Sequence, residues 1–192
     1  MTVAAAPRSL VLADLVPGGL VRDLALVIAA ATLTGVAAQV AIPLPFTPVP
    51  ISLQTFTVLL SAAALGPMRA AAAMLLYLVA GMGGVPWFSE QTSGWGFPSF
   101  GYILGFVIAA ALVGALARRG SDRSPRGAIG TMIAGNLVIY AVGVPYLAVA
   151  IGVGLPEAIG LGIAPFLVGD ALKVLLAAGV LPATWRVVGE RP

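Results

Sequence analysis

Two ionisable residues stand close together in one of the most apolar parts of this chain. Lys173, the only lysine, follows Asp170 by three residues inside the run from Ala164 to Leu181. In a helix this spacing places both side chains on one face, and ionisable groups at membrane depth usually face a cavity, a partner or a ligand. An ammonium group suits a carboxylate, and an aspartate accepts hydrogen bonds from the N–H groups of an amide or a urea. The pair therefore predicts a binding site for a small molecule that carries an acid at one end or a cyclic urea at the other.

A purely structural role for this pair is the alternative. A buried ion pair can fix the register of a helix, and the long side chain of Lys173 can reach toward the membrane surface. The two residues alone leave both roles open.

Further polar and aromatic side chains could line the same pocket. Amide groups orient a ligand in an apolar cavity, and indole rings offer flat faces to a ring system. On this basis the further candidates for substrate binding are Gln54, Trp87, Glu90, Gln91 and Asn136. An interfacial aromatic belt is the alternative for Trp87. Asn136 and Tyr140, one helical turn apart, could either line the pocket or form hydrogen bonds between helices.

The composition places these residues in a membrane protein. Of the 192 residues, 60% are hydrophobic and only 9% are charged, a balance that no water-soluble domain of this length holds in solution. The absence of cysteine and histidine removes disulfides, thiol nucleophiles, imidazole bases and the usual transition-metal ligands. We therefore expect neither catalysis nor a cofactor or metal. The net charge of +3 comes from arginines that are scattered along the chain, unlike a nucleic-acid-binding surface.

Six apolar stretches are candidates for membrane helices. They cover roughly residues 24–42, 51–65, 68–83, 102–117, 129–151 and 164–181, and the second is short and lies between proline-rich flanks. If all six cross the membrane, the nine arginines fall on one side, which the positive-inside rule makes cytoplasmic. The sequence thus predicts an all-α integral membrane protein, a bundle of six transmembrane helices with both termini cytoplasmic. Its expected parts are a cytoplasmic N-terminal segment, a membrane substrate-binding domain and a cytoplasmic tail, at residues 1–23, 24–182 and 183–192.

Small residues recur at helical spacing along the first stretch. Two registers are the candidates for a partner interface, Ala25 with Ala29, and Ala30 with Thr34 and Ala38, and a third consists of Ala31 and Gly35. Small side chains let helices approach closely in lipid, where packing drives association. These faces serve either packing within the chain or contact with a partner membrane subunit, and the residues leave both open.

Four motifs give the chain a resemblance to a known family. In chain order they are IPLPFTPVPISLQT at 42–55, GMGGVPWF at 81–88 after Tyr77-Leu78, GYILGF at 101–106, and PFLVGDALK at 165–173. They span nearly the whole apolar region and resemble the BioY family of biotin transporters, the substrate-binding S components of energy-coupling factor transporters. Because four motifs occur in the same order, the resemblance is highly specific.

The resemblance implies a six-helix fold that binds biotin near the outer face. The family's aspartate and lysine on the last helix match Asp170 and Lys173, and its proline-rich motif carries over to Thr47, Pro48, Gln54 and Thr55. Tyr102, in the third motif, joins the substrate-binding candidates. Biotin carries both a carboxylate and a ureido ring, which agrees with the ligand predicted from Asp170 and Lys173.

The resemblance also implies partners and a location. Uptake across the cytoplasmic membrane would need a transmembrane coupling (T) subunit, which meets the small-residue face of the first helix, and two ATP-binding-cassette ATPase subunits. Three alternatives remain: an S component for another small vitamin, a stand-alone carrier driven by an ion gradient, and an intramembrane hydrolase. The last is disfavoured because the chain lacks histidine and Asp170 has no second intramembrane aspartate.

Overall fold

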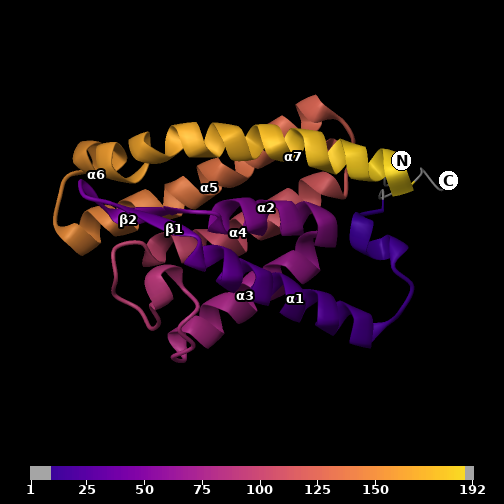
Figure 1. Ribbon diagram of the computed structural model, residues 1–192, viewed down its shortest axis with the longest axis horizontal. Coiled ribbons are helices and arrows are strands. Elements are labelled where there is room, and N and C mark those ends of the chain that lie inside the picture. Colours follow the sequence, from indigo (N-terminus) through magenta and orange to yellow (C-terminus); the bar gives the residue numbers. More distant parts are fainter. Residues whose placement is uncertain (1–9, 189–192) are drawn as a thin grey trace, which may run out of the picture.

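The fold is an elongated bundle of helices with one small β-hairpin (Figure 1). The computed structural model describes residues 10–188. Within this range the helices are α1 (Leu20–Gln39), α2 (Gln54–Leu65), α3 (Pro67–Met82), α4 (Phe100–Ala117), α5 (Pro125–Ile151), α6 (Leu155–Gly162) and α7 (Leu167–Val188). Each of the six apolar stretches corresponds to one of the helices α1–α5 and α7, and α6 is an additional short helix outside these stretches.

Four helical segments of the described residues have the length and hydropathy of a membrane span. They are α1, α4, α5 and the combined segment Leu155–Val188, whereas α2 and α3 are apolar but shorter. At about 1.5 Å per residue, the 12 residues of α2 extend only about 18 Å, less than the hydrocarbon core of a bilayer. The helix of α7 continues six residues beyond Pro182, so it outlasts the membrane segment expected from the sequence.

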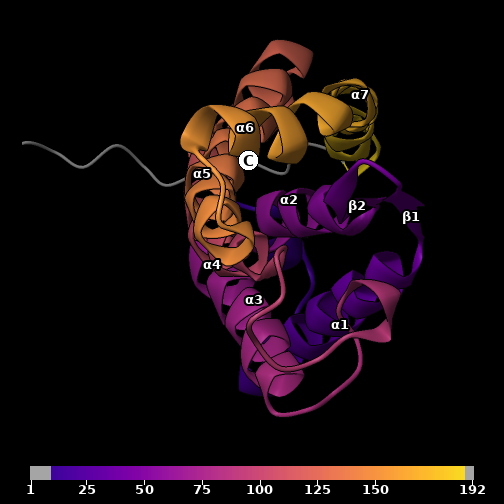
Figure 2. The ribbon, with the colours of Figure 1, turned by 90° about the vertical axis from the view of Figure 1, so that its left-hand side faces the viewer.

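The proline-rich segment before α2 forms a β-hairpin, whereas the sequence analysis predicted an all-α protein. Strands β1 (Ala41–Leu44) and β2 (Thr47–Ser52) pair antiparallel, with an irregularity between Ile42 and Leu44. Proline fixes φ near the extended region but lacks an N–H donor, so Pro43 fits where the regular pairing is interrupted. The hairpin lies at the same end of the bundle as α6, which faces the viewer in Figure 2.

Helix α4 is the centre of the bundle. Buried residues make up 61% of α4, against 28% of the most apolar 18-residue window of α1, and α4 contacts α2, α3 and α5. Glycine permits its closest approach to the α2–α3 connection, because a Cβ atom at Gly114 would lie 2.5 Å from both the carbonyl carbon of Gly66 and the nitrogen of Pro67. The packing around α4 fixes the helices that surround the pocket described below.

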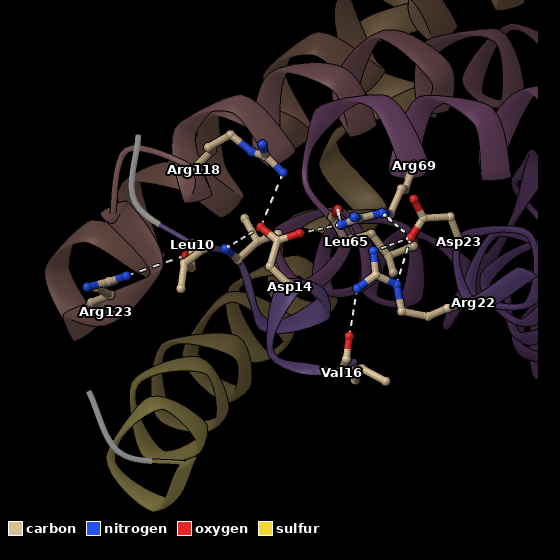
Figure 3. Close-up of polar contacts among 10 residues, drawn as sticks. Leu10, Asp14, Val16, Arg22, Asp23, Leu65, Arg69, Arg118 and Arg123 are labelled. Carbon is tan, nitrogen blue, oxygen red and sulfur yellow. Dashed lines mark hydrogen bonds and ion pairs between the residues drawn. The ribbon is translucent and has the colours of Figure 1, made fainter. Parts of the chain in front are cut away.

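A cluster of charges holds the N-terminal segment against the other end of the bundle (Figure 3). The short 3₁₀ helix Leu12–Leu15 follows the buried Val11 and presents Asp14 to two arginines. One oxygen of Asp14 lies 2.6 Å from Arg69 Nη1, and the other lies 3.4 Å from Arg118 Nη2 and accepts the backbone N–H of Val11. Arg69 also pairs with Asp23 at 2.9 Å. The cluster therefore ties the N-terminal segment to α1, α3 and α4.

This cluster predicts a specific loss of stability in acid. Burial raises the pKa of Asp14, but hydrogen bonds from Arg69 and Val11 and the charge of Arg118 bring it below the ordinary 3.8. A carboxyl group whose pKa is lower in the folded state than in the unfolded state stabilises the fold when the pH is above its unfolded-state pKa. This stabilisation disappears as the pH falls through its folded-state pKa. Asp14→Asn should lower the melting temperature in detergent at about pH 7 and should flatten the decline of stability below about pH 4.

Asp122 provides the matched control. It lies in the 3₁₀ helix Ser121–Arg123 and accepts a hydrogen bond from Trp185 Nε1 at 2.7 Å. Burial raises the pKa of Asp122 in the folded protein. Its effect on the pH dependence of stability therefore has the opposite sign to that of Asp14, because protonation of Asp122 stabilises the fold as the pH falls. Asp122→Asn should make the acid decline steeper. An acid decline in Asp14→Asn as steep as that of the unaltered protein would contradict the role assigned to the cluster.

Candidate binding site

One pocket lies at the end of the bundle that carries the hairpin and α6. It has a volume of about 600 Å³, including the part that opens at its mouth. Strand β2, the segment between α3 and α4, and helices α2, α4, α5 and α7 contribute its walls. The lining residues are Val49, Pro50, Ser52, Gln54, Thr55, Ser89, Phe97, Ser99, Tyr102, Ile103, Phe106, Asn136, Ile139, Tyr140, Phe166, Asp170 and Lys173.

Asp170 and Lys173 both line this pocket, as one face of α7. Lys173 Nζ lies 3.3 Å from one carboxylate oxygen of Asp170 and 2.8 Å from Thr55 Oγ1 on α2. The Tyr140 hydroxyl, on α5, donates to the other oxygen of Asp170. Asp170 is only 8% exposed, and the Lys173 side chain is 14% exposed. The pocket thus offers a carboxylate next to an ammonium group, a combination with no net charge that can both accept and donate hydrogen bonds.

A smaller hollow continues beyond the charged pair. Thr55, Asn136 and Lys173 line both spaces, and the smaller one is otherwise surrounded by Phe56, Leu59, Met132 and Val174. These apolar residues lie on α2, α5 and α7, on the side of Thr55, Asn136 and Lys173 away from the pocket. The three polar residues therefore separate the pocket from the smaller apolar hollow.

Gln54 joins the pocket to the segment between α3 and α4. Its side-chain nitrogen donates to the Tyr77 hydroxyl at 2.6 Å, and its oxygen accepts from the Ser89 hydroxyl at 3.1 Å. Tyr77 in turn donates to the Trp87 carbonyl, and Trp87 Nε1 donates to the Tyr77 carbonyl. Gln54 therefore lines the pocket and also fixes the segment that covers it.

Tyr102 lines the pocket with its ring but uses its hydroxyl elsewhere. The hydroxyl donates to the Gly162 carbonyl at 2.9 Å, at the end of α6. A Cβ atom at Gly143 would lie 2.6 Å from the Tyr102 ring, so glycine is needed where α5 meets this ring. Tyr102 thus joins α4 to α6 and supplies an aromatic wall.

Of the nine substrate-binding residues expected from the sequence, the structure brings Asp170, Lys173, Gln54, Tyr102 and Asn136 together around the pocket. The other four lie outside its lining. Thr47 donates to the Leu161 carbonyl at 2.8 Å and holds the hairpin to α6, and Trp87 packs against Gly35 of α1. Glu90 and Gln91 are exposed, in a turn where both have positive φ.

Further polar residues line the pocket. Thr55 was implied by the proline-rich motif of the family, and Tyr140, one turn from Asn136, was a candidate either for the pocket or for hydrogen bonds between helices. Ser89 and Ser99 gave no signal in the sequence, because their positions depend on the course of the segment between α3 and α4. Among residues 10–188, no cluster of three or more acidic side chains is placed to hold a metal ion.

The two small-residue registers of α1 have different surroundings. Ala30, Thr34 and Ala38 are buried within the chain, and the Thr34 hydroxyl donates to the Ala30 carbonyl at 2.9 Å. Ala25 and Ala29 are exposed, and Ala29 lines an apolar groove between α1 and α2. The register of Ala30, Thr34 and Ala38 therefore packs inside the bundle, and the register of Ala25 and Ala29 faces outward.

Comparison with known proteins gives a consistent result. A model described as the BioY family matches residues 6–190. The chain is 39% identical to a probable biotin transporter BioY from Lysinibacillus sphaericus over 65% of this chain, an alignment that spans 64% of that relative's length. It is 35% identical to a probable biotin transporter BioY from Pyrococcus horikoshii, over 81% of this chain and 91% of the relative.

The fold also matches a solved structure. The crystal structure of the S-component for biotin from an ECF-type ABC transporter superposes with a TM-score of 0.76 and 22% sequence identity, covering 85% of this chain and 90% of the other. At this identity the match concerns the arrangement of the helices.

Proposed function

The chain belongs to the BioY family, and we propose that it binds biotin in the pocket around Asp170 and Lys173. As a transporter and not an enzyme, it would serve biotin uptake as the S component of an energy-coupling factor transporter. The names of its relatives support this function, and the observation that carries it is the Asp170–Lys173 pair, both members of which line an accessible pocket.

The chemistry of the pocket matches both ends of biotin. A ureido ring has N–H donors for the Asp170 carboxylate and a carbonyl oxygen that can accept a hydrogen bond from Lys173. Because the pair has no net charge, the neutral ureido ring suits it better than a second carboxylate would. The Ser99 hydroxyl lies elsewhere on the lining and suits the carboxylate. Ring and chain carbons would pack against apolar side chains such as Phe97, Ile103, Phe106, Ile139 and Phe166.

Equilibrium binding to the purified protein tests this assignment. We expect isothermal titration calorimetry in detergent to give saturable binding of biotin. Dethiobiotin, which keeps the ureido ring and the carboxylate, should compete, whereas thiamine and riboflavin should not. Binding of another vitamin in place of biotin would transfer the site to a different substrate.

The distribution of arginine supports a membrane orientation. The described arginines lie near the start of α1, α3 and α5 or the end of α4 and α7, which Figure 1 places opposite the hairpin and α6. By the positive-inside rule this end is cytoplasmic. We propose six membrane-crossing helices with α2 and α3 among them, both termini in the cytoplasm and the pocket open to the outside. The proposed membrane domain is 24–182, flanked by cytoplasmic segments 1–23 and 183–192.

Energy for uptake would come from other subunits. The proposed partners are a transmembrane coupling subunit, which the outward-facing Ala25 and Ala29 register of α1 would contact, and two ATPase subunits. In a host without these subunits, we expect cells that produce this chain alone to accumulate no labelled biotin, and co-production of the three partners to restore uptake. Accumulation by the chain alone that collapses with the ion gradient would instead identify a stand-alone carrier.

A further inference from the structure

The Asp170 carboxylate is held by groups on two helices before any ligand binds. Tyr140 of α5 donates to one oxygen, and Lys173 of α7 lies 3.3 Å from the other. Lys173 is itself held by Thr55 of α2 at 2.8 Å. The order of these contacts is Tyr140, Asp170, Lys173, Thr55, and it crosses the pocket wall from α5 to α2.

An outer groove makes the contact between Tyr140 and Asp170 important for the direction of the carboxylate. An apolar groove runs between α5 and α7 on the outside of the bundle, and Leu137 and Leu175 on its sides are 63% and 62% exposed. The groove and the pocket share three lining residues, Asn136, Tyr140 and Asp170. The carboxylate of Asp170 therefore stands in a wall between the pocket and a lipid-facing surface.

The ring of Tyr140 is fixed independently of Asp170. It packs edge-on against the Tyr102 ring, with centroids 6.3 Å apart, and Tyr102 is anchored through its hydroxyl to Gly162. A donor held in this way constrains the direction of the carboxylate that accepts its hydrogen bond. Charge-assisted hydrogen bonds of this kind are also stronger than neutral ones.

We infer that Tyr140 is a positioning residue for biotin recognition, which keeps the Asp170 carboxylate turned into the pocket and away from the groove between α5 and α7. In this role Tyr140 occupies one side of the carboxylate and leaves the other free to accept the N–H groups of the ligand. The inference rests on the proposed function, because biotin is the ligand that reports it.

The experiment is a double-mutant cycle in detergent with biotin as the titrant. Tyr140→Phe keeps the ring and removes the donor, and it should raise the Kd about tenfold. In an Asp170→Ala background, where nothing remains to be oriented, adding Tyr140→Phe should change the Kd less than about threefold. Asp170→Asn is a second background, in which a neutral acceptor should give an intermediate effect.

Tyr146→Phe is the matched control. Tyr146 lies on the same helix, packs against Phe100 and is outside the pocket lining, so its loss of a hydroxyl should leave the Kd unchanged. Melting temperatures of all variants separate a loss of recognition from a loss of folding.

The outcomes distinguish the two proposals. If the unaltered protein and Tyr146→Phe bind biotin but Tyr140→Phe binds equally well, the positioning role is wrong and the proposed function stands. An equal loss in the presence and absence of Asp170 would make Tyr140 an independent contact of the ligand, again overturning the inference. If the unaltered protein does not bind biotin, the proposed function is wrong and the inference goes with it.

Discussion

Replacing Lys173 by alanine is expected to weaken biotin binding by about 1.5 to 3 kcal/mol, or roughly 10- to 150-fold in Kd. The ligand loses its proposed contact with the ammonium group, and Asp170 loses the cation at 3.3 Å that balances its charge. An unbalanced carboxylate in a wall of low polarity disfavours the placement of a ligand against it. Asp170→Asn should cause a loss of similar size, because a neutral amide accepts hydrogen bonds more weakly than a carboxylate does.

Titration calorimetry of the purified variants measures this effect. Thr184→Ala is the control on the same helix, since the Thr184 side chain is half-buried, lies outside the pocket lining and donates to the Val180 carbonyl. Its Kd should equal that of the unaltered protein. If both Lys173→Ala and Asp170→Asn are folded and bind biotin normally, the pair has only a structural role.

A large loss of stability is expected from Gly114→Ala in α4. The added methyl group would lie 2.5 Å from backbone atoms of Gly66 and Pro67, and backbone cannot turn away as a flexible side chain can. Gly66 has φ +79 and joins α2 directly to α3, so a shift at this point moves two helices. Overpacking of this kind costs about 3 kcal/mol at the upper end of the usual range.

Thermal unfolding in detergent, followed by circular dichroism, checks this result. Gly130→Ala of α5 is the matched control, because a methyl group at Gly130 would meet no atom within 4 Å. We expect its melting temperature to stay close to that of the unaltered protein. A similar melting temperature for Gly114→Ala would mean that the contact between α4 and the α2–α3 connection is looser than described.

The helices could be predicted from the sequence because apolar length is a strong signal in a membrane protein. Their limits were less accurate: α5 begins at Pro125, four residues before the apolar stretch begins, because Ser124 caps the helix by accepting the N–H of Gly127 and proline suits the first helical position. The hairpin was missed because prolines suggest a loop, although Thr47 and Val49 are buried and Pro48 is exposed, as an alternating strand requires. Helix α6 was missed because its eight residues are too short for a clear period.

The site could be predicted where one residue type was unusual in its surroundings. Asp170 and Lys173 were identified because ionisable groups are rare in apolar segments, and Asn136 because its amide lies within a long apolar helix. Thr47 and Trp87 have side chains that could donate hydrogen bonds to a ligand. In the structure they donate instead to the carbonyls of Leu161 and Tyr77. Loop residues such as Glu90 and Ser89 are adjacent in sequence, and only the folded path of the chain decides that Ser89 alone lines the pocket.

The contact between Thr55 and Lys173 joins residues 118 positions apart. A ribosome must therefore synthesise α7 before the proposed binding site has either of its charges, and a shorter chain would contain the hairpin and most of the walls without the two groups proposed to recognise biotin. Newly made protein would acquire affinity in a single late step of membrane insertion, when α7 docks beside α2 and α5.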